Sequence, residues 1–433
     1  MHRSIGYALS RKESMKFRLP MRAAMLLTLL GMLAGTYAVL RDFASFVETP
    51  DFDVYYTAAC LVRNHQSPAI YEDARLNDNP IVGIQNRQGA YSQTAVAHGI
   101  NGIGLYIYPP TLADLLVPFT WLSPLPALIV WELLSIAAAI AAAVLLTRTV
   151  GLYSLAPALL AIFVLFAFRP IFDCLYNGQI ACVLLLLLVA AISLYAGGHR
   201  FSAALLFSLA IAIKLTPLIV IVPFIAWRDW KILRFIALWC LAVFAALVCV
   251  NGWPALSMYM FDVMPKMTRF VLNSENRSLS MAIHSLWFGR NPAVALTGLS
   301  WAERFASALV LGLAGWLSRT RHPGEPKIVQ RIEAIAIFLL LACCLSPVSW
   351  THMYALSAPA LLLFARRAWQ GHAHLIELLI LMAFAISLSV EGYARMLVTT
   401  PMFGMAYSLL RLSSLSIEQD SDLSCGKLFT MPS

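Results

Sequence analysis

The stretch Asp51–Ala59 (DFDVYYTAA) follows the first long apolar run of the chain and opens a long polar segment. From Val54 onward, apolar residues recur at i, i+4 and i+7, which predicts a short amphipathic helix. Asp51 and Asp53 therefore lie just beyond a candidate membrane span, on a helix expected at the membrane–water boundary. A charge in that position is suited to chemistry on a lipid-linked substrate. Alternatively, Asp51 only caps the N-terminus of this helix.

The composition indicates a membrane protein. The chain has 433 residues, of which 60% are hydrophobic and 12% charged, with a mean hydropathy of +0.75. Soluble domains carry about a quarter charged residues, so we expect an all-α polytopic protein with roughly 10–12 spans of about 20 residues each. The net charge of +9 resides mainly in short segments between apolar runs. This pattern fits loops that face anionic lipid and gives no indication of nucleic-acid binding.

Charge also predicts the topology. Residues 1–22 carry six basic residues and one acid, so this end should stay in the cytoplasm and the first span should run outward. A cleavable signal peptide is the competing interpretation, but the apolar run is long for one. Residues 42–105 then form a structured external loop, within a membrane domain expected over 23–411. A polar tail, 412–433, completes the chain.

A buried cation is predicted in the middle of the apolar run Phe201–Trp227, which is broken at Lys214–Pro217 (KLTP). Both flanks of the run are basic. We therefore expect two short helices that enter from one side and meet at depth near Lys214. A charged residue and a proline at depth should line a cavity, because lipid can satisfy neither. Lys214 could instead extend its amine to an interface.

On this topology, polar motifs gather at one membrane face, and Lys214 reaches toward them from below. An acid, a histidine, amides and cations in one place suit group transfer from a phosphate-linked lipid. Such a reaction needs a base for the acceptor hydroxyl and positive charge for the departing phosphate. The motifs are Asp51/Asp53, Asn177–Gln179 (NGQ), Asn276–Ser278 (NRS) and Ser349–His352 (SWTH).

Together with Tyr108-Pro109-Pro110, Lys214–Pro217 and Ser346–Ser349, these motifs make the chain resemble glycosyltransferase family 87. This group of polytopic GT-C enzymes includes mycobacterial polyprenyl-phosphate-mannose-dependent α-1,2-mannosyltransferases. The resemblance covers about residues 22–370, and the chain after about 395 departs from it. It implies a GT-C-type helical bundle in the inner (plasma) membrane of the cell envelope. It also implies inverting transfer of a hexose, mannose by analogy, from a polyprenyl-phosphate donor to a glycan or glycolipid hydroxyl on the external face.

The resemblance assigns roles to individual residues. Asp51 matches the catalytic aspartate of the first external loop, with Asp53 as second choice. His352 matches a histidine near the active site, where it could orient the acceptor or contact the phosphate. Lys214 would bind the donor phosphate, helped by Arg277 or Arg169. The residues expected to line the substrate site are Tyr55, Tyr108, Asn177, Gln179, Asn276 and Trp350.

Several of these residues also have plain structural interpretations. His352 could satisfy a buried hydrogen bond, and Asn177 and Gln179 could only hold a turn. Arg169 is more simply an interfacial anchor, and Tyr108 introduces a proline pair that fixes where a helix begins. The competing function is a lipid or solute transporter or flippase, which also needs charges at depth and broken helices. The two halves of the chain show no matching interrupted segments, which favours the enzyme.

No metal-ligand spacing occurs in the sequence. Lysine and arginine can stabilise a phosphate leaving group, so we expect no required metal and no cofactor beyond the lipid-linked donor. The expected partners are membrane lipid, the polyprenyl-phosphate donor and the glycan or glycolipid acceptor.

Overall fold

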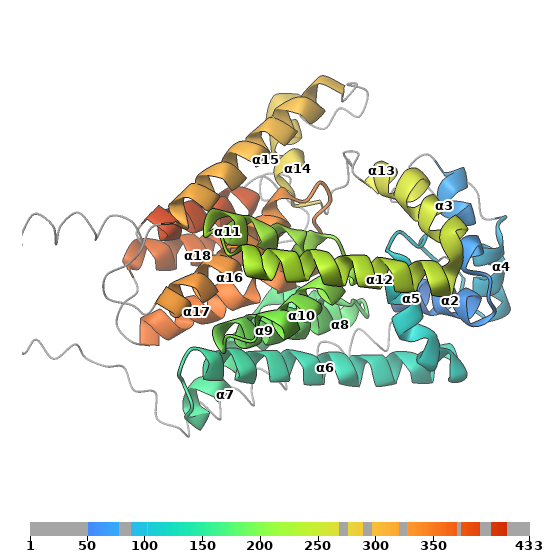
Figure 1. The fold of residues 1–433 in the computed structure, drawn as a ribbon, viewed down its shortest axis with the longest axis horizontal. Helices are drawn as coiled ribbons and strands as arrows, with labels where there is room; N and C mark the ends of the chain where they lie inside the picture. The colour runs from blue at the N-terminus through green and yellow to red at the C-terminus, as the bar shows by residue number, and fades with distance from the viewer. Residues whose placement is uncertain are drawn as a thin grey trace, which may run out of the picture.

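The computed structural model describes residues 51–77, 88–101, 103–267, 276–288, 297–319, 327–369, 374–389 and 400–413, and in these ranges every regular element is a helix (Figure 1). The predicted all-α class is therefore confirmed. The cytoplasmic N-terminus expected over 1–22, the first span and nearly all of the expected tail lie outside the described residues.

The first polar segment is structured, as predicted, and it continues into the first long helix. Its elements are α2 (Asp51–Arg63), η1 (Ser67–Tyr71), α3 (Glu72–Leu76), α4 (Ala90–Ala97), α5 (Pro110–Leu116), η2 (Val117–Trp121) and α6 (Pro124–Thr149).

The middle of the chain alternates between helices and short breaks. Its elements are α7 (Leu155–Ala167), α8 (Arg169–Tyr176), α9 (Ala181–Ala196), α10 (Arg200–Ile213), η3 (Thr216–Val220), α11 (Ile221–Ala226), α12 (Trp230–Ser257), the π-helix η4 (Met258–Val263) and α13 (Met264–Met267).

The last part completes the bundle. Its elements are α14 (Leu279–Phe288), α15 (Thr297–Leu317), α16 (Lys327–Leu345), η5 (Thr351–Ser357), α17 (Ala358–Trp369), α18 (Leu375–Ser389) and a helix over 400–413.

Three helical stretches among the described residues are long and apolar enough to cross a membrane: α6, the continuous stretch Trp230–Met267, and α16. A fourth is formed if α7 and α8, bent by 66° at Phe168, count as one broken span. Other apolar runs fold into helices of 10–17 residues because turns or prolines interrupt them. The chain is thus a multi-pass membrane protein, and the span number of 10–12 stays a prediction.

The hairpin expected around Lys214 is confirmed. Helix α10 ends at Ile213, and Lys214 has extended backbone angles of φ −151° and ψ 131° before η3 begins. The two limbs of the hairpin are α10 and the stretch formed by η3 and α11. At the ends far from Lys214, the Arg200 Nε atom lies 3.3 Å from a carboxylate oxygen of Asp229, which follows α11. Both limbs therefore start and finish on the same side of the bundle, and the break projects toward the other side.

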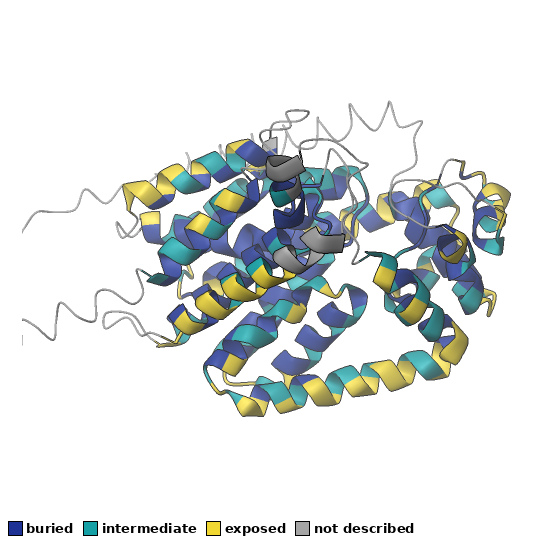
Figure 2. Ribbon diagram, turned by 90° about the horizontal axis from the view of Figure 1, so that it is seen from above, coloured by how far each residue is buried: buried dark blue, intermediate teal, exposed yellow. Residues whose placement is uncertain are grey.

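Helix α2 is buried on all sides, and this corrects the amphipathic interpretation. All ten residues from Phe52 to Leu61 are buried. Helices α4 and α5 and the short turns η1 and η2 pack around α2. By contrast, only 11% of the most apolar 18 residues of the stretch Trp230–Met267 are buried, so α12 lies on the outside of the bundle. Figure 2 shows the same division, with buried residues gathered in the interior and exposed residues along outer helices.

The far end of the α12 stretch holds the first segment in place. Gly252, at φ +76°, and Pro254 introduce a kink into the helix. Beside the kink, Asn251 Nδ2 donates to Asp114 Oδ2 over 2.8 Å. Further along, the Lys266 ammonium donates to the carbonyl oxygens at the end of α3, those of Ala74, Arg75 and Asn77. These contacts fix α3 and α5 against α12.

Candidate functional site

Asp51 and Tyr55 are one helical turn apart on α2, so both project from the same face. Gln179 connects them. Its Nε2 atom donates to Asp51 Oδ2, and its Oε1 atom accepts a hydrogen bond of 2.6 Å from the Tyr55 hydroxyl. Gln179 is 1% exposed. The structure therefore brings together three residues that are distant in sequence, and Gln179 does more than hold a turn.

The turn that carries Gln179 is held close to α2. Gly178 has φ +64°, and a Cβ atom at this position would lie 2.7 Å from the Cβ atom of Phe52. The indole N–H of Trp131 donates to the Gly178 carbonyl over 2.8 Å, and the Cys174 thiol donates to the Gln179 carbonyl over 3.3 Å. Only glycine permits both this backbone angle and this approach. The turn thus fixes Gln179 against Asp51.

Tyr108 and Lys214 extend the same cluster. The Tyr55 and Tyr108 hydroxyl oxygens lie 3.2 Å apart, within hydrogen-bond distance, and the two rings meet edge to face. Lys214 Nζ lies 5.3 Å from the centre of the Tyr108 ring, within the range of a cation–π contact. The charge of Lys214 also interacts with that of Asp51. A carboxylate and an ammonium group therefore occupy one interior region, joined by two tyrosines and an amide.

His352 approaches this region from η5. It interacts electrostatically with Lys214 and is 6% exposed. Within the described part of the chain, its Nε2 atom has no hydrogen-bond partner, and neither has the buried indole nitrogen of Trp350, whose ring centre lies 5.8 Å from that of His352. Buried polar atoms without partners are rare in folded proteins and indicate a functional or solvent-filled site. This nitrogen is thus available to a ligand, and the role of His352 in the active site stays a prediction.

Asn276 and Arg277 hold the segment that carries His352. Asn276 Oδ1 accepts from the Ser349 backbone N–H over 3.0 Å. The Arg277 backbone N–H donates to the Ser349 carbonyl over 2.7 Å, and Arg277 Nε donates to Thr351 Oγ1 over 2.9 Å. A further bond of 2.6 Å joins Arg277 to the Ser387 carbonyl. Two motifs singled out in the sequence are thus bonded to each other, and the contacts of Arg277 are those of a support for the η5 segment.

Three other predicted site residues make separate contacts. Asp53 is two positions from Asp51, so it projects from a different side of α2; burial raises its pKa from 3.8 to about 6. Asn177 Nδ2 donates to the Asp173 carbonyl over 2.8 Å, which is the turn-holding role. Arg169 forms an ion pair with Asp173 at 2.6 Å.

Sequence reasoning missed Trp131, which fixes the Gly178 carbonyl. The available signal was a tryptophan inside an apolar run, because a buried indole N–H normally finds an acceptor. Which acceptor it finds depends on how α6 packs, which the sequence does not reveal.

No group of three or more histidine, cysteine, aspartate or glutamate residues in the described ranges is arranged to hold a metal ion. The expectation that no metal is required stays a prediction. The residues that the structure does bring together supply a proton acceptor, a cation and hydrogen-bonding groups. This set suits a group-transfer reaction in which the leaving group departs as an anion.

Comparison with known proteins identifies one matching family and two relatives that are group-transfer enzymes. The sequence model described as "Glycosyltransferase family 87" matches residues 106–347, more than half of the chain. A polyprenol-phosphate-mannose-dependent alpha-(1-2)-phosphatidylinositol mannoside mannosyltransferase of Mycolicibacterium smegmatis is 29% identical over 304 residues, 65% of this chain and 66% of that protein. The protein of the same name in Mycobacterium tuberculosis is 26% identical over 364 residues, 79% of this chain and 77% of the relative.

Proposed function

Because the chain belongs to glycosyltransferase family 87, we propose that it transfers mannose from a polyprenyl-phosphate donor to a hydroxyl group of a glycolipid or glycan. The names of the two relatives support the donor and suggest an inositol-linked mannoside as the acceptor class. Family membership favours this enzyme over the transporter alternative.

The observation that carries the proposal is the position of Asp51. Its carboxylate is bound by Gln179 and interacts with the charge of Lys214. In the proposed step, Asp51 takes the proton of the acceptor hydroxyl, and the acceptor oxygen forms a bond to the anomeric carbon. The bond from that carbon to the phosphate oxygen breaks at the same time, and the polyprenyl phosphate leaves as an anion beside Lys214.

Other residues take supporting roles in this proposal. The unpartnered nitrogen atoms of Trp350 and His352 are available to bind sugar hydroxyls or phosphate oxygens. Arg277 and Asn276 position the segment that carries them. We place the site at the external face of the membrane, because the basic loops should stay in the cytoplasm. A single displacement of this kind inverts the anomeric configuration.

The test measures transfer in isolated membranes from synthetic polyprenyl-phosphate mannose to a phosphatidylinositol mannoside. We expect Asp51→Asn to abolish transfer at unchanged protein level, and Asp53→Asn to retain it. Asp262→Asn, which removes a carboxylate from η4, serves as the matched control and should retain transfer. Full activity of Asp51→Asn would remove Asp51 as the base, and loss of activity only in Asp53→Asn would transfer that role to Asp53. The anomeric configuration of the product, and transfer in intact spheroplasts, test inversion and sidedness.

A further inference from the structure

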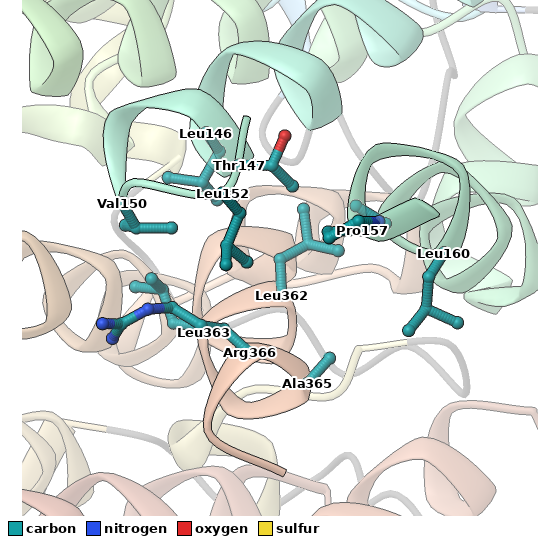
Figure 3. Close-up of a pocket in the computed structure, with 11 residues that line it drawn as sticks. Leu146, Thr147, Val150, Leu152, Pro157, Leu160, Leu362, Leu363, Ala365 and Arg366 are labelled. Carbon is teal, nitrogen blue, oxygen red and sulfur yellow. The ribbon is translucent and has the colours of Figure 1, made fainter. Parts of the chain in front are cut away.

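Figure 3 shows a pocket between α6, α7 and α17, lined mainly by aliphatic side chains. Its free volume of about 30 Å³ is enough for only a few water molecules, so it cannot hold a lipid chain or a sugar. Trp131, which binds the Gly178 carbonyl, and Thr147, which lines the pocket, are sixteen positions apart on α6. At a rise of 1.5 Å per residue, they are separated by about 24 Å. The pocket thus adds no second substrate site, whereas the side chains next to Asp51 are bonded to one another.

The side-chain amide of Gln179 is held at both ends. Its NH2 group donates to Asp51 Oδ2, and its carbonyl oxygen accepts from the Tyr55 hydroxyl over 2.6 Å; the Tyr108 hydroxyl lies 3.5 Å from the same oxygen. A carboxylate only accepts hydrogen bonds, whereas a phenol can donate one, so this orientation of the amide satisfies both neighbours. The reverse orientation would turn the amide oxygen toward the carboxylate, and the two would repel each other.

The backbone of Gln179 does not depend on Tyr55. Its N–H donates to the Cys174 carbonyl over 2.8 Å, and its carbonyl accepts from the Cys174 thiol over 3.3 Å. Loss of the Tyr55 hydroxyl should therefore leave the turn in place and release only the side-chain amide.

Burial increases from Asp51 to Tyr55. Asp51 is half-buried, Gln179 is 1% exposed and Tyr55 is fully buried. The residue that carries the carboxylate is thus the most accessible of the three, and a substrate that reaches it does not need to touch the Tyr55 hydroxyl. The charge of Asp51 nevertheless interacts with the Tyr55 phenol. These contacts suit a residue that acts on Asp51 and not on the substrate.

We propose that Tyr55 is a positioning residue of the transferase site. Its hydroxyl holds the Gln179 amide, and through it the Asp51 carboxylate, in the orientation that receives the proton of the acceptor hydroxyl. This role differs from the substrate-lining one predicted from the sequence. The inference rests on the proposed function, because it takes Asp51 as the base.

The test compares Tyr55→Phe with Tyr56→Phe in the mannose-transfer assay. Both variants remove one buried hydroxyl from α2, and that of Tyr56 donates to the Leu122 carbonyl over 2.8 Å. We expect Tyr55→Phe to lower kcat per amount of folded protein about tenfold, the effect of one lost hydrogen bond, with little change in KM for donor or acceptor. Tyr56→Phe should keep the native kcat. A raised KM at native kcat would show that Tyr55 binds substrate and would overturn the inference.

A double-mutant cycle tests whether Tyr55 acts through Gln179. Gln179→Leu removes the amide and should lower kcat at least as much as Tyr55→Phe does. In the Gln179→Leu background, Tyr55→Phe should have no further effect on kcat, because the group through which it acts is absent. Effects of the two substitutions that multiply independently would contradict the proposal.

Infrared difference spectroscopy gives a readout that does not need transfer. The difference between the native protein and Asp51→Asn identifies the carboxylate band of Asp51, whose frequency depends on its hydrogen bonds. This band should shift in Tyr55→Phe and stay in place in Tyr56→Phe; an unshifted band in Tyr55→Phe would rule out positioning. If Asp51→Asn keeps full transfer, the proposed base and this inference fail together. If Asp51→Asn abolishes transfer but Tyr55→Phe behaves as Tyr56→Phe does, only the inference fails.

Discussion

Asp51 and Asp53 carry the same chemical group, and their position on α2 separates their roles. Successive residues of a helix are turned by about 100°, so residues two apart diverge while residues four apart share a face. Asp51 therefore shares a face with Tyr55 and meets Gln179. Asp53 is 9% exposed, and burial disfavours its charged form. One carboxylate is thus suited to accept a proton from substrate, and the other affects stability.

The raised pKa of Asp53 predicts a pH dependence of stability. The folded chain keeps this proton up to about pH 6, whereas the unfolded chain releases it near the ordinary value of 3.8. Stability should therefore fall as the pH rises between these values and stay lower above them. The loss amounts to about 3 kcal/mol for two pKa units.

Asp53→Asn cannot ionise, so it should lack this loss. We expect its melting temperature to fall less than that of the native protein between about pH 4 and pH 7, the window set by the shift in pKa. Thermal unfolding in detergent measures the difference, with Asp262→Asn as the control for removal of a carboxylate elsewhere. Parallel pH profiles for Asp53→Asn and the native protein would contradict the prediction.

At the scale of the element, the Asn177-Gly178-Gln179 turn between α8 and α9 decides how closely this part of the chain can approach α2. Gly178→Ala combines an unfavourable positive φ with a contact of 2.7 Å to Phe52. We expect it to displace Gln179 from Asp51, to lower stability by about 1–3 kcal/mol, and to abolish most transfer.

Gly198→Ala is the matched control, because Gly198 has φ +83° and nothing within 4 Å of an added Cβ atom. It bears the same backbone strain without the clash, so it should lower the melting temperature moderately and keep transfer. Melting temperature and transfer rate measured on both variants test the prediction. Equal activity of the two variants would show that the close approach at Gly178 is unimportant.

Local patterns predicted some elements and not others. The helical class, the break at Lys214 and the grouping of motifs could be predicted, because apolar run lengths, a lysine–proline break and polar residues at span ends are local signals. The complete burial of α2 could not, because the segments that cover its second face lie elsewhere in the chain. The bonds of Gln179 to Asp51 and of Asn276 to Ser349 join residues far apart in sequence, and they follow only from packing.

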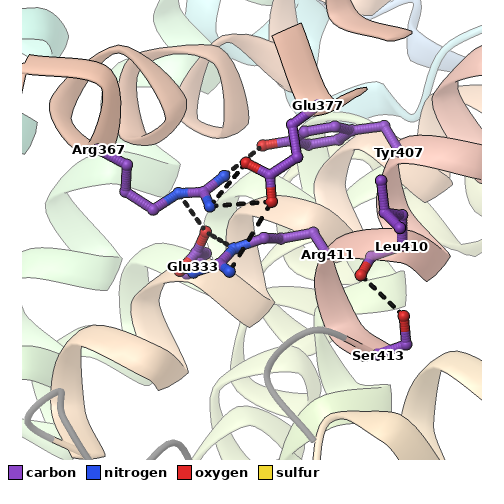
Figure 4. A network of polar contacts seen from close by, with 7 residues as sticks. All are labelled: Glu333, Arg367, Glu377, Tyr407, Leu410, Arg411 and Ser413. Carbon is purple, nitrogen blue, oxygen red and sulfur yellow. Dashed lines mark hydrogen bonds and ion pairs between the residues drawn. The ribbon is translucent and has the colours of Figure 1, made fainter. Parts of the chain in front are cut away.

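At the scale of the whole molecule, a buried ion network joins α16, α17, α18 and the helix over 400–413 (Figure 4). Arg411 Nε lies 2.6 Å from a Glu333 oxygen, and Arg367 bridges Glu333 at 3.2 Å and Glu377 at 2.9 Å. Tyr407 accepts a further hydrogen bond from Arg367 over 3.3 Å. All four charged side chains are less than 10% exposed, so water cannot readily replace a partner that is lost.

Removing one charge from this network should be costly. Glu333→Gln leaves two buried guanidinium groups facing one carboxylate, and we expect a loss of about 3–5 kcal/mol in stability. Asp173→Asn breaks the more exposed pair with Arg169 and should cost about 1 kcal/mol or less. Thermal unfolding of both variants in the same detergent measures the contrast. A loss for Glu333→Gln no larger than that for Asp173→Asn would contradict the predicted importance of the network.

The hairpin at Lys214 has a consequence for biosynthesis. Helix α10 has 14 residues and the second limb is the short stretch Thr216–Ala226, whereas an independently inserting segment needs about 20 residues. Neither limb can enter the bilayer alone, and the lysine between them would arrive without a partner. We therefore expect this hairpin to be stable in the bilayer only when it packs against α9 and α12, the helices that α10 contacts, so that the ammonium group meets Tyr108 as it leaves water.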